Sequence, residues 1–170
     1  MLGKQLAVAL GMGAAVALLV LAWSRLADLP LPLPDGDDTP ARLAFVAHWL
    51  LLPGLSLFLG VAIVANQRFF VADAIDGGES KSRLIEIARR YNTNTVEQTL
   101  LAMIAWLGLA LTLPHGTLKL IPAMALSFFV GRVLFFIGYL IAPVGRAFGL
   151  GLTAYPSFAA LVWLAWQMAR

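Results

Sequence analysis

Residues 90–113 read RYNTNTVEQTLLAMIAWLGLALTL, a polar stretch that runs directly into an apolar one. Residues 99–113 carry no Asp, Glu, Lys or Arg, which is typical of a helix inside a bilayer. In the polar stretch, Arg90, Asn94 and Glu97 stand at i, i+4 and i+7, on one face of an α-helix. An ionised side chain in hydrocarbon costs roughly 3 to more than 10 kcal/mol, so such residues usually face a protein-lined site. We therefore expect a membrane helix whose polar end carries a functional stripe.

The composition predicts a membrane protein. The 170 residues are 61% hydrophobic and 12% charged, with a mean hydropathy of +0.85, whereas soluble domains carry about 25% charged residues. We expect an all-α, polytopic integral membrane protein with a single membrane domain over residues 1–170. The twelve Lys and Arg residues are dispersed, which argues against a nucleic-acid partner despite the net charge of +3. The chain has no cysteine, so any thiol chemistry needs a thiol from a substrate.

Five apolar segments are long enough to cross a membrane as helices, at roughly 20 residues each. We expect an additional N-terminal helix at about residues 5–27, an outward acidic and proline-rich loop at 28–41, and a four-helix bundle at about 42–170. The bundle helices are predicted at residues 43–67 with a kink at Pro53-Gly54, at 83–113 after a turn at 76–80, at 120–144 and at 150–167.

The first apolar segment has two interpretations, a signal peptide or a retained helix. Its uncharged core, residues 5–24, exceeds the roughly 7 to 15 residues of a signal-peptide core. Trp23-Ser24-Arg25 is also not a small-residue cleavage site. We therefore expect a retained first helix.

Lys and Arg are distributed unevenly between the two sides of the predicted membrane. Seven lie on the side of the N-terminus and four on the other side. The positive-inside rule then places the N-terminus, the 68–90 loop and Arg146 in the cytoplasm. The pattern suits a bacterial inner (plasma) membrane.

A second polar stripe follows on the next predicted helix, where Arg132, Tyr139 and Arg146 stand at i, i+7 and i+14. The short connection at residues 114–116 implies that the two helices pack antiparallel. With Arg90 and Arg146 at the same membrane surface, the two stripes line one groove.

This pairing predicts specific contacts. Tyr139 is expected near Asn94 or Glu97, and an arginine such as Arg132 is expected to compensate Glu97. The remaining arginines are expected to bind an anionic ligand. The alternative is a structural polar network that only fixes helix register, which accounts for a Glu97–Arg132 pair but leaves the other arginines unexplained.

Both stripes resemble motifs of the MAPEG family, the membrane-associated proteins of eicosanoid and glutathione metabolism. Residues 90–97, RYNTNTVE, look like the R-x-x-x-N-x-x-E signature of that family. Residues 131–139, GRVLFFIGY, with Arg146 seven residues on, are similar to the R-x6-Y-x6-R spacing of its leukotriene-forming synthases. The resemblance covers roughly residues 45–169 and places the two motifs on consecutive helices.

The resemblance implies a homotrimer of four-helix subunits, with a glutathione site between neighbouring subunits near the cytoplasmic side. In that arrangement Arg132 supports the polar core of the glutathione site, Arg146 is the catalytic residue that faces the thiol, and the ligand is held by Arg90, Asn94, Glu97 and Tyr139. Arginine side chains suit the carboxylates of glutathione, and a glutamate suits its amino group. Amide and phenol groups can form hydrogen bonds with its peptide bonds. A guanidinium beside the sulfur lowers the pKa of the thiol.

The implied function is that of a glutathione S-transferase or peroxidase, with glutathione as co-substrate and lipophilic electrophiles arriving through the membrane lipid. The alternative is a non-catalytic MAPEG-fold protein that binds lipid or scaffolds a partner. It is motivated by Gln98 and Phe135, which stand where the leukotriene-forming members carry aromatic hydroxyls. The first segment has no counterpart in the four-helix pattern and is expected to be a peripheral helix outside the trimer core.

Two other classes of function have little support in the sequence. A small transporter is disfavoured because the segments show no visible internal repeat. A metal site is not expected, because Asp35, Asp37 and Asp38 lack the later ligands of a calcium loop.

Overall fold

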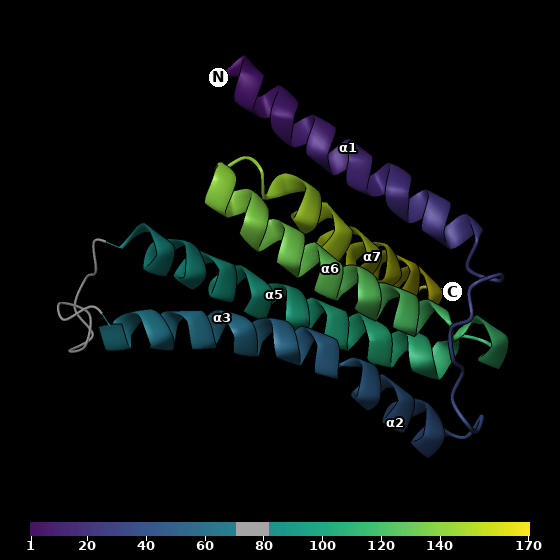
Figure 1. Ribbon diagram of the computed structural model, residues 1–170. Coiled ribbons are helices and arrows are strands. Elements are labelled where there is room, and N and C mark those ends of the chain that lie inside the picture. Colours follow the sequence, from purple (N-terminus) through teal and green to yellow (C-terminus); the bar gives the residue numbers. More distant parts are fainter. Residues whose placement is uncertain (71–81) are drawn as a thin grey trace.

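The computed structural model describes residues 1–70 and 82–170, and in these ranges the chain consists of helices and short connections (Figure 1). The helices are α1 (Leu2–Ser24), α2 (Thr39–Trp49), α3 (Leu51–Phe70), α5 (Arg83–Thr112), α6 (Leu120–Ile141) and α7 (Ala147–Met168), with a 3₁₀ helix at His115–Thr117. The turn predicted at residues 76–80 lies outside the described residues.

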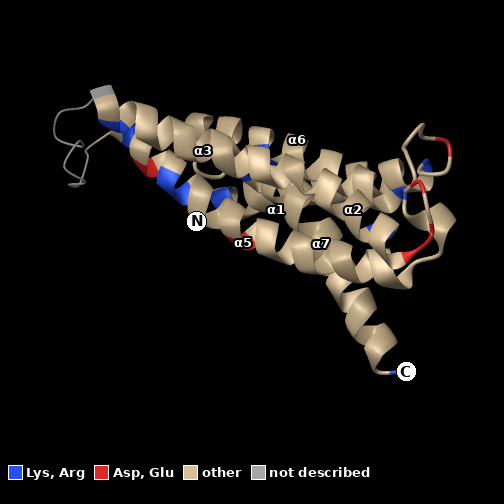
Figure 2. Ribbon diagram, turned by 90° about the horizontal axis from the view of Figure 1, so that it is seen from below, with Lys and Arg blue, Asp and Glu red and all other residues tan. Residues whose placement is uncertain are grey.

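The helices have the lengths and the arrangement of a membrane protein. Five helical stretches in the described residues are apolar and long enough to cross a bilayer: Leu2–Ser24, Thr39–Phe69, Arg83–Thr112, His115–Ile141 and Ala147–Met168. Charged residues gather mostly at the two ends of the bundle (Figure 2). The chain runs back and forth, so its termini lie at opposite ends (Figure 1). The prediction of an all-α, polytopic integral membrane protein is confirmed.

The second predicted helix is broken close to the expected kink. α2 ends at Trp49 and α3 begins at Leu51, with Leu50 between them. The cause is Pro53, which has no N–H to donate to the carbonyl of Trp49 and whose ring crowds that carbonyl. The break therefore falls one turn before the proline, while the two helices together still form one membrane span.

Four spans pack as a bundle in which α5 contacts α3, α6 and α7. In the half of the bundle away from the polar stripe of α5, Trp106 and Phe128 meet edge to face with ring centroids 6.3 Å apart, and both are buried. An aromatic pair of this kind contributes about 0.5 to 1.5 kcal/mol beyond the area it buries. The pair fixes α5 against α6, the two helices that carry the predicted site.

The additional N-terminal helix lies on the outside of the bundle. α1 packs mainly against α7, and its buried residues are Ala15 and Leu19. Ala15 fits against Gly151, where an added Cβ would lie 2.7 Å from the Cβ of Ala15. The expected extra helix is therefore present, at the periphery of the four-helix bundle.

The loop between α1 and α2 is fastened to the end of α5 by Arg42. Nη1 of Arg42 donates to the carbonyl oxygens of Ala110 and Leu113 over 2.7 and 2.8 Å. The Ala110 carbonyl needs such a donor because the residue four positions later is Pro114, which has no N–H. Arg42 also binds the carboxylate of Asp37, so one side chain joins the loop to the bundle.

We expect an Asp37→Asn variant to lose a small, pH-dependent part of the stability. The hydrogen bond from Arg42 holds the pKa of the Asp37 carboxyl below its ordinary value of 3.8. A carboxylate whose pKa is lowered by folding stabilises the fold above its unfolded pKa, and this contribution is lost as pH falls through the folded pKa. In thermal unfolding in detergent, the unfolding midpoint of the wild-type protein should be slightly higher than that of the variant at about pH 6. The two midpoints should be equal near pH 2. A difference that stays constant over this range would contradict the ionic contact.

Candidate functional site

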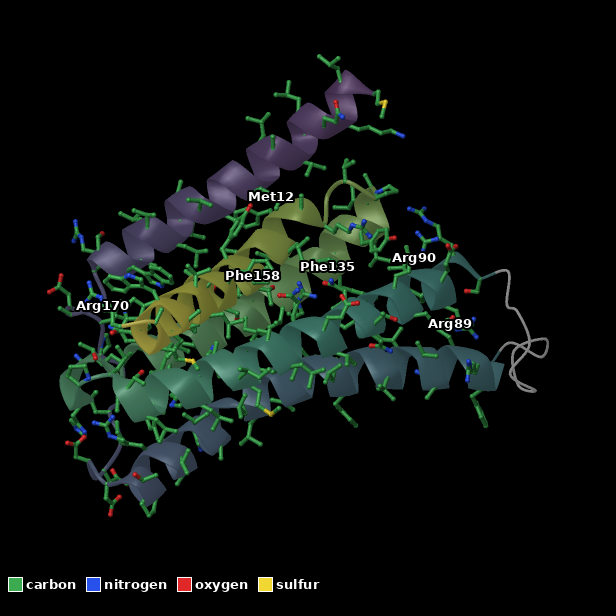
Figure 3. The ribbon with its side chains drawn as sticks, turned by 180° about the vertical axis from the view of Figure 1, so that it is seen from behind. Met12, Arg89, Arg90, Phe135, Phe158 and Arg170 are labelled. Atoms are coloured by element: carbon green, nitrogen blue, oxygen red, sulfur yellow. The ribbon has the colours of Figure 1, made fainter. Side chains whose placement is uncertain are left out.

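The polar stripe of α5 is present as predicted. α5 is continuous from Arg83 to Thr112, so Arg90, Asn94 and Glu97 lie on one face of it. From Arg90 to Glu97 the stripe rises roughly 10 Å along the helix axis. In Figure 3, Arg90 lies near the end of the bundle, beside the turn that joins α6 to α7. Residues of α6 and α7 contact this face at two levels along the axis of α5, an outer level near the end of the bundle and a deeper level inside it.

At the outer level, Arg90, Tyr139 and Arg146 form a group that we call the terminal cluster. Nη1 of Arg90 donates to the Tyr139 hydroxyl over 3.0 Å. The guanidinium carbon of Arg146 lies 4.7 Å from the centroid of the Tyr139 ring, a cation–π contact. Two guanidinium groups therefore share one phenol, and three of the predicted site residues meet at one place.

A small cleft of about 160 Å³ opens beside the terminal cluster. Its walls include Arg90 and Tyr139 together with Arg83 and Glu86. Glu86 forms an ion pair with Arg90 one turn further along α5. Two arginines, Arg83 and Arg90, and one carboxylate, that of Glu86, thus line the cleft, and Arg146 adds a third guanidinium on the ring of Tyr139, another residue of the lining. The excess of positive over negative charge at this place favours an anionic ligand in the cleft.

At the deeper level, Arg132, Asn94 and Thr153 form a second group, the inner cluster. Arg132 is fully buried, with 0% of its surface exposed. Its Nη1 donates to Oδ1 of Asn94 over 2.8 Å, while Nε and Nη2 donate to Oγ1 of Thr153 over 3.2 and 3.0 Å. Among residues 1–70 and 82–170, no carboxylate oxygen lies within 4.0 Å of this guanidinium. Neutral oxygens therefore hold a buried cation.

The predicted pairing of the two stripes is wrong by one to two helical turns. Tyr139 contacts Arg90 instead of Asn94 or Glu97, and Arg132 contacts Asn94. Within the part of the chain that the structure describes, Glu97 has no arginine partner. Its carboxylate accepts a long hydrogen bond of 3.4 Å from Nδ2 of Asn94. Instead of the expected ion pair between Glu97 and Arg132, the side chain of Asn94 forms hydrogen bonds with both residues.

The end of α6 explains the shift. Ala142 precedes Pro143 and has an extended backbone, with φ −154° and ψ 147°, so α6 ends at Ile141. Arg146 is consequently the N-cap residue of α7 and not a residue of α6. The prediction that Arg146 continues the α6 stripe two turns beyond Tyr139 is wrong, because the turn folds Arg146 back over the Tyr139 ring.

Gln98 and Phe135 point into the bundle. Gln98 is 6% exposed, and its Oε1 is buried with no hydrogen-bond partner among the described residues. The Phe135 ring centroid lies 4.5 Å from the guanidinium carbon of Arg132 and 5.9 Å from the Tyr139 ring centroid. Phe135 therefore packs between the two clusters.

Two residues of the site were not selected from the sequence. Thr153 accepts both hydrogen bonds from Arg132 and donates to the carbonyl of Gly149 over 2.7 Å. Its signal in the sequence is a hydroxyl within the mostly apolar segment 150–167. Glu86 stands four residues before Arg90, a spacing at which opposite charges on a helix pair.

Replacing Thr153 by valine should lower the free energy of unfolding by about 2 to 3 kcal/mol. The change keeps the side-chain shape but removes the acceptor for two N–H groups of a buried cation, and hydrogen bonds to charged groups contribute about 1.5 to 3 kcal/mol. Thr112→Val is the matched control, because the Thr112 hydroxyl binds the Gly108 carbonyl at an exposed position. Denaturant unfolding in detergent should separate the two variants. Equal losses would show that the inner cluster adds nothing to stability.

The chain has detectable similarity to one protein family and to longer membrane proteins. The sequence model of the MAPEG family matches residues 45–169. Transmembrane protein 79 of Mus musculus is 27% identical over 148 residues, which cover 87% of this chain and 38% of that protein. Transmembrane protein 79 of Bos taurus is 27% identical over 152 residues, which cover 89% of this chain and 38% of that protein. The chain thus spans well under half the length of these relatives.

No solved structure matches the chain. Both clusters lie within the family-matched residues 45–169, whereas α1 lies before them.

Proposed function

The chain belongs to the MAPEG family, and we propose that it is a glutathione-dependent membrane transferase or peroxidase acting on lipophilic electrophiles that arrive from the bilayer. The observation that carries the proposal is the terminal cluster, where Arg90, Tyr139 and Arg146 converge beside a cleft. Arginines that outnumber the nearby carboxylates favour an anionic ligand. Glutathione brings carboxylates and an ionisable thiol.

Four residues of the stripes each fit one part of glutathione. Arg90 is positioned to bind a carboxylate, and the Tyr139 phenol and the Asn94 amide suit peptide groups. Glu97 is exposed and, among the described residues, unpaired with any arginine, so it is available for the α-amino group. Because Arg132 is fully buried, we assign it to holding Asn94 in place.

Arg146 is the proposed catalytic residue. A guanidinium beside the sulfur favours the thiolate, which is the nucleophilic form. In conjugation, the thiolate forms a carbon–sulfur bond to the electrophile while the bond to its leaving group breaks. In the peroxidase reaction, two glutathione molecules are oxidised to their disulfide, and the two electrons and two protons that they give up break the O–O bond of a hydroperoxide to form an alcohol and water. In both reactions the chain supplies binding and thiolate stabilisation.

We propose the homotrimer that the family resemblance implies, and the small size of the cleft supports a contribution from a neighbouring copy. At about 160 Å³ the cleft falls below the roughly 300 Å³ at which ligand pockets begin, so a neighbouring copy is needed to complete it. Val96 and Leu100, on α5 beside the stripe, are 46% and 51% exposed and offer an apolar surface for that copy.

We also propose that the N-terminus and the terminal cluster face the cytoplasm. The support is the excess of Lys and Arg at that end of the bundle. A bacterial inner membrane stays a prediction from the same charge pattern.

A second candidate function is a non-catalytic MAPEG-fold protein that binds lipid or scaffolds a partner. It is favoured by Gln98 and Phe135, which have no phenolic hydroxyl to offer a ligand and whose side chains are buried in the bundle. Glutathione binding separates this candidate from the enzyme.

Isothermal titration of the purified full chain with glutathione tests the proposed function. Arg90→Gln should weaken binding about tenfold or more, because a hydrogen bond between charged groups contributes about 1.5 to 3 kcal/mol. Arg89→Gln is the matched control, since it removes the same charge from a different face of α5 (Figure 3), and it should bind as wild type does. No binding at millimolar glutathione, or equal losses in both variants, would contradict the proposal and favour the second candidate.

A further inference from the structure

A large apolar groove lies between α1 and α7, toward the end of the bundle opposite the terminal cluster. Its volume is about 660 Å³. Figure 3 shows Phe158, which lines the groove, between the two helices. One wall belongs to α1, which lies outside the family-matched residues 45–169. The groove is therefore an addition to the four-helix pattern and shares no residue with either polar cluster.

The length and direction of the groove match one leaflet of a bilayer. Along α7 it runs from Tyr155 to Trp166, roughly 16 Å at the rise of an α-helix. This distance is about half of a hydrocarbon core of about 30 Å. Trp23 and Trp166 form the end nearest the C-terminal ends of α1 and α7, and tryptophan is enriched at membrane surfaces. The groove thus extends from the membrane surface toward the bilayer middle, as an acyl chain does.

A second apolar cavity adjoins the first. It has a volume of about 350 Å³, is lined by Leu109 and Met124 on its far side, and shares Trp23, Ala159 and Trp163 with the groove. Two adjoining apolar cavities suit the two chains of a phospholipid better than a single-chain ligand.

Two arginines stand at the outer end of the groove. Arg25 caps the end of α1, two residues after Trp23. The guanidinium carbon of Arg170 lies 3.5 Å from the ring centroid of Trp166. Both side chains are exposed, and in the ranges 1–70 and 82–170 neither has a carboxylate oxygen within 4.0 Å. Their charges complement an anionic headgroup at the depth where headgroups lie.

We propose that the groove binds one anionic phospholipid from the leaflet at the C-terminal ends of α1 and α7. The acyl chains occupy the two cavities, and the phosphate-bearing headgroup lies between Arg25 and Arg170. This binding is independent of glutathione, so either proposal can fail without the other.

Tryptophan fluorescence of the full chain in vesicles with brominated acyl chains tests the proposal. Bromine quenches tryptophan on contact, and Trp23, Trp163 and Trp166, three of the five tryptophans, line the groove. Brominated phosphatidylglycerol should show an apparent affinity about 25-fold above that of brominated phosphatidylcholine, since each of the two surface arginines contributes roughly a factor of five.

Variants of the charged residues show how much Arg25 and Arg170 contribute to the lipid preference, because every variant keeps the same tryptophans. The double variant Arg25→Gln/Arg170→Gln should bring the affinity ratio close to one. Lys4→Gln/Arg89→Gln, which removes two charges at the opposite end, should keep the wild-type ratio. Ala159→Phe fills the wall shared by both cavities and should reduce quenching by both lipids.

Three results would overturn the proposal. They are equal quenching of wild-type protein by the two lipids, a preference that survives the loss of both arginines, and shielding of the groove tryptophans from both lipids. The last result would mean that a second copy of the chain covers the groove.

Discussion

Replacing Arg146 by alanine should lower the rate of glutathione conjugation to a model electrophile by about 100-fold. Removing one preorganised group that stabilises developing or resident negative charge typically costs about 10²- to 10³-fold. In the proposed function Arg90 and Tyr139 still hold glutathione in this variant, so the loss should appear mainly in kcat at neutral pH. The loss should shrink as pH rises, because the thiol then ionises without a neighbouring guanidinium.

Two further variants make the Arg146 result specific. Arg146→Lys keeps the charge and should recover part of the rate. Lys4→Gln removes a charge from the first turn of α1, whose N-terminal end lies at the same end of the bundle as the α6–α7 turn (Figure 1). Lys4 belongs to neither cluster, and the variant should leave the rate unchanged. An unchanged turnover rate in Arg146→Ala would contradict the proposed mechanism.

Replacing Gly149 by alanine should destabilise the protein by about 3 kcal/mol, within the range of overpacked cores. An added Cβ would lie 2.3 Å from the backbone nitrogen of Phe135 and 2.4 Å from the carbonyl oxygen of Gly131. α6 and α7 would have to separate, and Thr153, one turn along α7, would move away from Arg132.

Gly13→Ala is the control for this prediction, because an added Cβ there meets nothing within 4 Å. Alanine in an exposed helix is favoured over glycine by about 0.5 to 1 kcal/mol. The two substitutions should therefore shift the thermal unfolding midpoint in opposite directions. A Gly149→Ala protein as stable as wild type would contradict the close packing of α6 on α7.

The sequence predicted most of the fold because helix lengths and breaks follow from local rules. The start of α5 after Ser82 and the break before Pro53 were both predicted to within a few residues. The spacing of Arg90, Asn94 and Glu97 also fixed which residues of α5 share a face, because helix geometry alone determines that.

The contacts between helices could not be predicted in the same way. The register of α6 against its neighbours depends on glycines that allow backbones to touch, as Gly149 does against Gly131, and hydrophobic periodicity does not show which glycines are in contact. The end of α6 depends on the turn at Pro143, which moved Arg146 off the predicted stripe. Arg132 was expected to pair with an acid, whereas a hydroxyl and an amide on two different helices hold it.

The ultraviolet absorbance of the thiolate of protein-bound glutathione, followed as a function of pH, tests the role of Arg146 most directly. A free thiol has a pKa of about 8.5. If Arg146 stabilises the thiolate, the bound thiol should titrate at least about one pH unit lower in the wild-type protein and return toward the free value in Arg146→Ala. A bound thiol that titrates at the free value in the wild-type protein, or at the same lowered value in both proteins, would contradict that role.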